Sequence, residues 1–255
     1  MNADHGEVTL SFSSPSIARV KFGHPRGNSL PRAVLTELAQ KINQASASKS
    51  CRVIILESAG DGPFCAGASF DELTEIKSVD AGEKFFSGFA EVILALNQAS
   101  QVTVAKIQGK CAGGGVGLAC ATDYSLALSG AAVRLSELAI GIGPFTIGPV
   151  VEQRVGAAAF TELALSAEWR DAEWAHRNKI FTELFPTEEE LEKRLQELAL
   201  KFASYPQAAT TAVKRMVGEG ARENLSELLK KRVRAVSELV VTAEAQALIA
   251  AAKRR

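Results

Sequence analysis

The sequence predicts an α/β protein, with a mixed core over residues 1–186 and a helical region over residues 187–255. Short β-branched segments alternate with amphipathic segments through the first half of the chain, as in parallel α/β sheets. Turns of glycine and other small residues directly follow two of the predicted strands. From about Thr187 the chain is highly charged, its apolar residues recur at helical spacing, and no strand pattern returns.

The first part of the chain predicts a hairpin, a helix and a buried strand. Residues 7–12 and 17–22 read as short strands on either side of a turn that contains proline, which favours a β-hairpin. A helix is expected from Pro31 to about Ala47, because the apolar side chains there recur at helical spacing. The β-branched run 52–56 predicts a buried strand.

The middle of the chain continues the alternation. A helix is predicted over residues 82–98 and a strand over residues 102–107. A glycine loop and a helix of small residues that ends near Ala121 follow this strand. Residues 123–128 and 132–135 predict two further short strands, so the core has the character of a parallel sheet.

Composition and charge narrow the classes of function. The 255-residue chain carries 29 Lys and Arg against 29 Asp and Glu, so its formal net charge is zero. This balance gives no overall electrostatic basis for binding nucleic acid or a membrane surface. The longest uncharged run, residues 138–151, is shorter than the roughly 20 residues that span a bilayer. We therefore expect neither membrane nor nucleic-acid partners.

The one uneven stretch of charge lies in the helical region. From Lys214 onward, ten basic residues stand against five acidic ones. A solvated helix face and a patch for an anionic ligand or partner both fit this surplus.

Cysteine and histidine spacing argues against a metal site and against a secreted protein. The four cysteines form no C-x-x-C pair, and the three histidines lie far apart in the sequence. The N-terminus lacks the basic-then-apolar layout of a signal peptide. We expect reduced, buried cysteines, no metal and a cytoplasmic location.

Two clusters of small residues suggest a pair of backbone hydrogen-bond donors. Residues 113–117 (GGGVG) open a predicted helix, whose first amides favour negative charge. Residues 66–68 follow another predicted strand, so both turns are expected at the same end of the sheet. Two amides converging from these turns would form an oxyanion hole, although the spacing alone fits packing turns equally well.

Other glycine-dependent sites are excluded. A P-loop requires Gly-Lys-Ser/Thr, but Gly109 and Lys110 are followed by Cys111. The dinucleotide fingerprint requires a third glycine where this chain has Leu118 or Cys120. A Gly-x-Ser-x-Gly nucleophile turn does not occur in the sequence.

Three blocks, in this order, resemble the crotonase superfamily, the enoyl-CoA hydratase/isomerase family: residues 64–68 (FCAGA), 108–115 (QGKCAGGG) and 133–144 (VRLSELAIGIGP). The resemblance extends from Val8 to about Val217. It implies a ββα spiral core with a helical C-terminal region that builds trimers, often paired into hexamers. It also implies an acyl-CoA thioester substrate, so coenzyme A arrives with the substrate and no separate cofactor is expected.

The resemblance assigns roles to individual residues. Ala68 and Gly114 match the two amides that hold the thioester oxygen, and Glu137 matches the catalytic glutamate. Lys230 or Lys231 are candidates for contact with the phosphates of coenzyme A. The positions matched to the bound acyl-CoA are Arg26, Ala66, Gly67, Ala68, Gly114 and Gly117.

The chain departs from the family pattern in its carboxylates. Family hydratases add water with two glutamates, and the position of the second is Gly117 here. One carboxylate suffices to move a proton between the α and γ carbons, and family isomerases keep only the residue that matches Glu137. Its apolar neighbours predict a raised pKa for Glu137. Asp71 and Glu72 are candidates for a second acid.

Two further departures concern the shape of the acyl pocket. Ser69 stands where the family commonly has aspartate, and residues 144–149 (PFTIGP) replace a more glycine-rich segment.

The sequence therefore predicts an acyl-CoA enzyme that stabilises a thioester enolate and transfers a proton through Glu137. Isomerisation of an enoyl-CoA double bond is favoured, and an enoyl-CoA hydratase of short-chain or methylglutaconyl type is the alternative. A non-catalytic trimeric or RNA-binding homologue is the alternative from another class. The neutral charge argues against that homologue, and the basic C-terminal region argues mildly for it.

Overall fold

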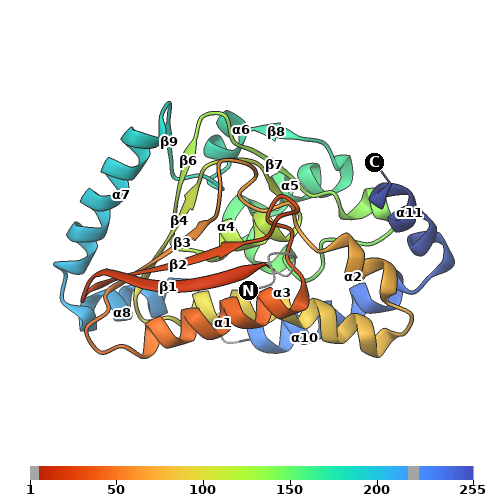
Figure 1. Ribbon diagram of the computed structural model, residues 1–255, viewed down its shortest axis with the longest axis horizontal. Helices are drawn as coiled ribbons and strands as arrows, with labels where there is room; N and C mark the ends of the chain where they lie inside the picture. The colour runs from red at the N-terminus through yellow and green to blue at the C-terminus, as the bar shows by residue number, and fades with distance from the viewer. Residues whose placement is uncertain (1–5, 218–223, 255) are drawn as a thin grey trace.

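The computed structural model describes residues 6–217 and 224–254, and a six-stranded β-sheet forms its centre (Figure 1). The strand order is β1-β2-β3-β4-β6-β9, in which only β1 and β2 are antiparallel. The strands are β1 (Glu7–Ser14), β2 (Ile17–Gly23), β3 (Val53–Ser58), β4 (Val102–Ile107), β6 (Tyr124–Leu128) and β9 (Glu183–Phe185). The predicted hairpin and parallel strands are confirmed.

A second, three-stranded sheet brings two distant segments together. It consists of β5 (Cys111–Ala112), β7 (Ala132–Arg134) and β8 (Arg170–Asp171) in the order β5-β7-β8. Because β5 pairs with β7 in parallel, the glycine turn after β5 lies beside the segment that follows β7. The Gly113 amide donates to the Arg134 carbonyl at 2.8 Å, which extends this pairing toward Glu137.

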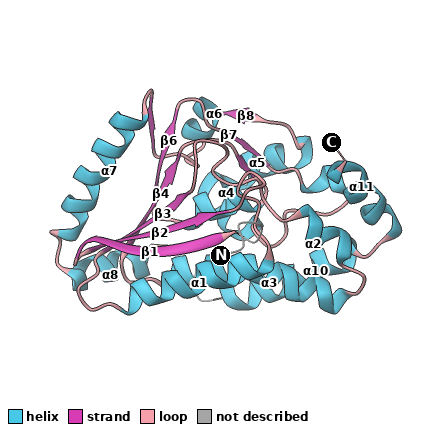
Figure 2. Cartoon of the chain, viewed as in Figure 1, coloured by secondary structure: helices cyan, strands magenta, loops and turns pink. Residues whose placement is uncertain are grey.

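Helices cover the main sheet on both faces (Figures 1 and 2). Those of the core are α1 (Arg32–Ala47), α2 (Phe70–Glu75), α3 (Val79–Gln98), α4 (Gly114–Ala121), α5 (Gly148–Ser166) and α6 (Ala172–Arg177), with a 3-10 helix at Glu137–Ile140. Those of the C-terminal region are α7 (Glu188–Ala203), α8 (Gln207–Met216), α10 (Leu225–Val240) and α11 (Ala243–Lys253).

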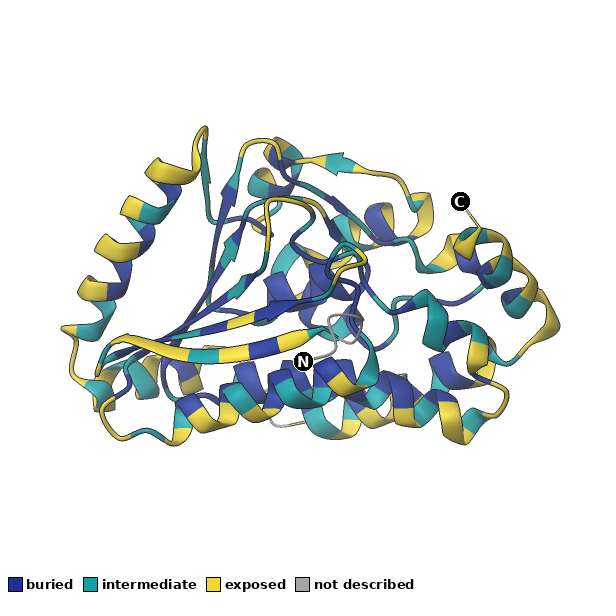
Figure 3. Cartoon of the chain, in the orientation of Figure 1, coloured by how far each residue is buried: buried dark blue, intermediate teal, exposed yellow. Residues whose placement is uncertain are grey.

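Alternate side chains of strand β3 enter two separate cores. Ile54 and Leu56 belong to the larger core, which contains the apolar faces of α1 and α3. Val53 and Ile55 pack in the smaller core with the leucines of α7, which buries one face and exposes the other (Figure 3). The leucine spacing that predicts a helix after Thr187 thus produces a layer over the sheet.

The predicted α/β class and the helical C-terminal region are confirmed. Within the described part of the chain, every element from Glu188 onward is a helix. The division at residue 186 stays a prediction, as does assembly into trimers. No single described helix has the length and apolarity of a membrane span, and α10 and α11 meet that criterion only as a pair bent by 82°.

Two helix starts differ from the sequence prediction because serines cap them. Helix α3 begins at Val79 rather than residue 82, since the Ser78 hydroxyl accepts from the Ala81 amide at 3.2 Å. The unpredicted short helix α2 begins after Ser69, whose hydroxyl accepts from the Glu72 amide. The residue that departs from the family pattern, Ser69, therefore acts as a helix cap.

Candidate active site

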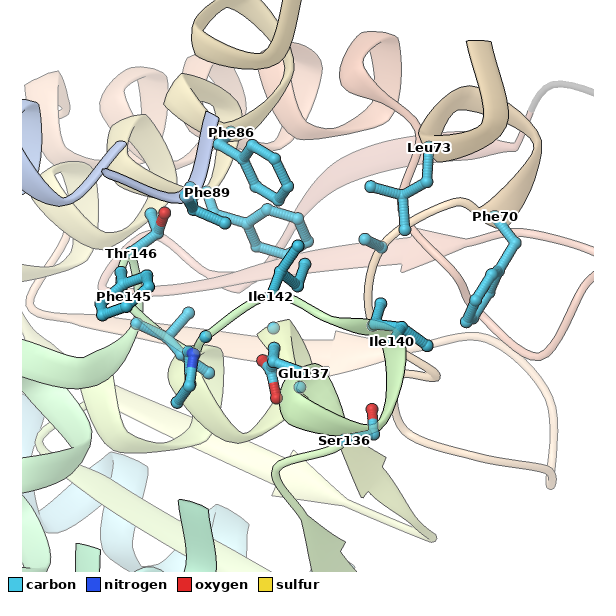
Figure 4. Close-up of a pocket in the computed structure, with 18 of the residues that line it drawn as sticks. Phe70, Leu73, Phe86, Phe89, Ser136, Glu137, Ile140, Ile142, Phe145 and Thr146 are labelled. Carbon is cyan, nitrogen blue, oxygen red and sulfur yellow. The ribbon is translucent and has the colours of Figure 1, made fainter. Parts of the chain in front are cut away.

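A cavity of about 60 Å³ lies where the two small-residue turns meet α3 and the 3-10 helix (Figure 4). Further wall residues come from α2, α10 and residues 136–147. The residues predicted for the site that line the cavity are Ala66, Gly67, Ala68, Gly114 and Glu137. The structure thus brings together both proposed donor turns and the proposed acid.

Backbone pairing holds the two turns against each other. Cys65 and Cys111 form an isolated parallel bridge, and the Ala112 amide donates to the Cys65 carbonyl at 2.9 Å. A Cβ built on Gly115 would lie 2.6 Å from that carbonyl oxygen, so only glycine permits this approach. The glycine at position 115 is therefore required by the contact between the two blocks.

The amides of Ala68 and Gly114 are unpaired within the described part of the chain, and both residues line the cavity. Gly114 is the first residue of α4, where helix amides have no partner inside the helix. The two turns converge, because the Gly114 nitrogen lies 3.8 Å from the position of a Cβ built on Gly67. The geometry fits a pair of donors to one oxygen atom.

Glu137 faces these turns from the start of the 3-10 helix. Its Oε1 lies 3.0 Å from a Cβ built on Gly113, and its buried Oε2 has no hydrogen-bond partner among the described residues. Burial raises the pKa of Glu137 from 4.5 to about 7, against smaller lowering effects of a backbone hydrogen bond and of Arg134. The predicted direction of this pKa shift is confirmed.

The apolar wall around Glu137 differs from the one its sequence neighbours suggest. Leu138 is exposed, at 42%, and does not line the cavity. The apolar surface comes instead from distant elements: Phe70, Leu73, Phe86, Phe89, Ile140, Ile142, Phe145, Ile147 and Val236. Phe86 and Phe89 are three residues apart and share one face of α3, and this spacing is the one local pattern that indicates part of the wall.

Gly117 and Arg26, also predicted for substrate binding, do not line the cavity. Ile147 fills the space beside Gly117, because a Cβ on Gly117 would lie 2.4 Å from Ile147 Cγ2. Arg26 is 65% exposed and forms an ion pair with Asp71 on α2. Gly117 is thus a packing residue in this structure, and Arg26 lies on the surface.

The candidates for a second acid and for phosphate contact also lie elsewhere. Asp71 pairs with Arg26 and with Lys253, and Glu72 accepts from the Arg32 amide at 2.8 Å. Neither acid lines the cavity. Lys230 pairs with Glu227 on the same helix at 2.7 Å, and Lys231 is exposed. Arg222 and Arg255, part of the basic surplus, lie outside the described residues.

Comparison with known proteins identifies the family of this chain and its fold. The sequence matches the enoyl-CoA hydratase/isomerase family over residues 13–254. The fold resembles the crystal structure of an enoyl-CoA hydratase from Bacillus halodurans with a TM-score of 0.89, at 22% identity over 96% of this chain and 99% of that chain.

Two named relatives are similar in sequence. The probable enoyl-CoA hydratase echA12 of Mycobacterium leprae is 27% identical over 222 residues, which cover 84% of this chain and 75% of that protein. The mitochondrial methylglutaconyl-CoA hydratase of Rattus norvegicus is 29% identical over 202 residues, which cover 78% of this chain and 64% of that protein. This chain therefore spans less than two thirds of the mitochondrial relative.

The fold and the site together define an acyl-CoA enzyme of the crotonase superfamily, as the sequence blocks predict. The chain belongs to the enoyl-CoA hydratase/isomerase family.

Proposed function

We propose that this protein is an enoyl-CoA isomerase that moves one proton between the α and γ carbons of an acyl thioester through Glu137. The observation that carries this proposal is that a single acid in the described part of the chain lines the cavity. Among the described residues that line it, Glu137 is the only carboxylate. The position of a second family glutamate is Gly117, and Ile147 fills the space beside it.

The two unpaired amides supply the electrostatic part of the reaction. The thioester oxygen accepts hydrogen bonds from the amides of Ala68 and Gly114, so the negative charge that develops on proton removal is stabilised there. Donors fixed in advance need no reorganisation during the reaction, and losing one typically costs about 2.7–4 kcal/mol of transition-state stabilisation. Phe86 and Phe89 line this region with apolar surface.

Glu137 carries the proton. As a carboxylate it accepts a proton from the α carbon of a 3-enoyl thioester or from the γ carbon of a 2-enoyl thioester. This leaves a dienolate whose negative charge is on the thioester oxygen. As a carboxylic acid it then donates the same proton to the other of these two carbons. The double bond shifts, and no atom is gained or lost. A pKa of about 7 suits both steps, because the acid and its conjugate base are then similar in energy near neutral pH.

Hydration is the second candidate, favoured by the names of the relatives above. Family hydratases add water with two glutamates, and no second carboxylate in the described residues lines the cavity. The two functions therefore predict different products from the same protein.

Separate incubation with a 2-enoyl-CoA and a 3-enoyl-CoA, followed by mass spectrometry and chromatography of the products, tests the proposal. We expect the two isomers to interconvert at unchanged mass, and Glu137→Gln to lower the rate at least a hundredfold. Formation of 3-hydroxyacyl-CoA from the 2-enoyl substrate would overturn isomerisation. The matched control is Glu75→Gln, an exposed acid at the end of α2, which should retain full activity.

The same variants address the non-catalytic alternative. Salt-dependent RNA binding that survives Glu137→Gln, together with no turnover of either enoyl-CoA, would favour an RNA-binding homologue.

A further inference from the structure

Besides Glu137, the side chains of Ser136 and Thr146 are polar and line the cavity, and the proposed proton transfer uses neither of them. Thr146 is 5% exposed, and its Oγ1 has no hydrogen-bond partner among the described residues. Thr146 lines the same cavity as Glu137, near Phe89 and Phe145 (Figure 4). Burying a hydroxyl without a partner costs free energy, and native proteins bury few such groups.

The local fold does not account for this hydroxyl. A threonine shortly before a helix commonly caps it, and α5 begins at Gly148. However, the residue at the cap position is Ile147, and no side chain caps this helix. The Gly148 amide is satisfied by the Pro144 carbonyl at 2.7 Å. Thr146 Oγ1 is therefore left for something that enters the cavity.

The surroundings of Thr146 limit the chemistry of that ligand. Phe89 and Phe145 lie near Thr146, and Phe86 and Val236 add further apolar surface to the same cavity. No Lys, Arg or His among the described residues lines the cavity, and its one charged side chain is the acid Glu137. An anionic acyl end would be buried there without a counter-charge and near a carboxylate, which is unfavourable.

We infer that Thr146 is a specificity-determining residue that hydrogen-bonds an uncharged oxygen near the end of a short acyl chain. The inference rests on the proposed function in one respect, that the ligand is an acyl-CoA. A threonine hydroxyl donates to a carbonyl oxygen and accepts from a hydroxyl, so the ligand oxygen is of either kind. The cavity has a volume of about 60 Å³, and one water needs roughly 10–15 Å³ on the same measure, so the cavity holds only a short acyl end.

This contact explains why an unpaired hydroxyl is retained in an apolar wall. A site that hydrogen-bonds a substrate group discriminates against an analogue that lacks it, because the buried partner is then left unsatisfied. An unsubstituted chain of the same length would fit the walls and leave Thr146 without a partner. An acyl chain that ends in a carboxylate would bring a negative charge into the apolar surroundings of Thr146.

Calorimetric titration with saturated acyl-CoA esters tests the inference without turnover, because a saturated chain has no double bond to move. The ligands are pentanoyl-CoA, 4-oxopentanoyl-CoA, 5-hydroxypentanoyl-CoA and glutaryl-CoA. We expect one of the two neutral oxygenated ligands to bind about tenfold tighter than pentanoyl-CoA, and glutaryl-CoA to bind more weakly than pentanoyl-CoA. The isosteric variant Thr146→Val should abolish the oxygen preference, whereas Thr146→Ser should retain it.

The outcomes separate this inference from the proposed function. If none of the four esters binds, the proposed function and this inference both fail. If pentanoyl-CoA binds but neither oxygenated ligand binds more tightly, only this inference is overturned, whatever the variants do. An oxygen preference that persists in Thr146→Val, or tighter binding of glutaryl-CoA, also overturns it. A melting curve for each variant verifies that it is folded.

Discussion

The side chain of Ile147 occupies the space beside Gly117, so that a Cβ built on Gly117 would lie 2.4 Å from Ile147 Cγ2. Gly117 is buried within α4, and Ile147 is 4% exposed directly before α5. The missing side chain at one position and the branched side chain at the other are therefore complementary. No side chain, least of all a glutamate, fits at position 117 unless Ile147 moves.

This complementarity predicts that the two positions are energetically coupled. Gly117→Ala should destabilise the protein by about 1–3 kcal/mol through overpacking, despite the higher helix propensity of alanine. Ile147→Ala should cost about 2–5 kcal/mol by leaving a cavity. The destabilisation of the double variant, measured by urea unfolding, should be smaller than the sum of the two single costs by at least about 1 kcal/mol.

Gly130→Ala is the matched control, because a Cβ at Gly130 meets no atom within 4 Å. Alone, Gly130→Ala should hardly change the free energy of unfolding. Combined with Ile147→Ala, its effect should add to the effect of that substitution. Additivity of Gly117→Ala and Ile147→Ala within about 0.5 kcal/mol would contradict a direct contact between these positions.

The raised pKa of Glu137 predicts how the reaction depends on pH. Proton abstraction requires the carboxylate, and the pKa of Glu137 is about 7. The value of kcat/KM for isomerisation should therefore rise about tenfold per pH unit below pH 7 and level off above it. The measurement is a pH–rate profile between pH 5 and 9 with a 3-enoyl-CoA. A profile that is already flat at pH 5 would mean that Glu137 keeps an ordinary pKa or is not the base.

The same pKa shift predicts a stability change of defined sign. Folding raises the pKa of Glu137 from 4.5 to about 7, so the folded state favours the protonated acid. The resulting stability is fully present below pH 4.5 and is lost as the pH rises through 7. Glu137→Gln keeps a neutral side chain and escapes this loss. At pH 8.5 the free energy of unfolding of the variant should exceed that of the wild type by roughly 3 kcal/mol, and this difference should shrink toward pH 4.5.

Chemical denaturation of both proteins at several pH values measures this difference, with Glu75→Gln as the control for removal of an exposed acid. A difference between wild type and Glu137→Gln that does not change with pH would refute burial of the charged form as the cause.

The predicted site residues that meet at the cavity come from short segments of the sequence. The turns of Ala68 and Gly114 and the segment of Glu137 each follow a strand, and the sheets bring them to one cavity. Even the cap of α2 had a local signal, since Ser69 is followed by Asp71 and Glu72 in the first turn.

The other parts depend on contacts between residues far apart in the chain. Phe86 and Val236 enter the cavity from α3 and α10, and no local pattern indicates that these helices meet there. For the same reason the sequence could not show that Ile147 fills the space at Gly117. Nor could it reveal that Thr146 has a buried hydroxyl without a partner, because satisfaction of a hydrogen bond is a property of the packed structure.

Asp71 holds two cations near the cavity, which gives a prediction for binding of coenzyme A. Its carboxylate pairs with Arg26 and with Lys253, the latter at 2.8 Å, and these two partners lower the pKa of Asp71. Phe70, the residue before Asp71, lines the cavity, so both cations lie close to its α2 side. If Arg26 contacts the nucleotide end of coenzyme A, Asp71 competes with the phosphates for this charge.

Asp71→Asn should therefore tighten binding of coenzyme A by roughly two- to fivefold in low salt, because it frees two positive charges for the anionic ligand. The gain should disappear near 0.5 M salt, where exposed charges are screened. Titration of coenzyme A at both salt concentrations measures the effect, and Glu75→Gln removes a negative charge from the same helix as a control. Weaker binding by Asp71→Asn alone would instead mean that Asp71 orients Arg26 toward the ligand.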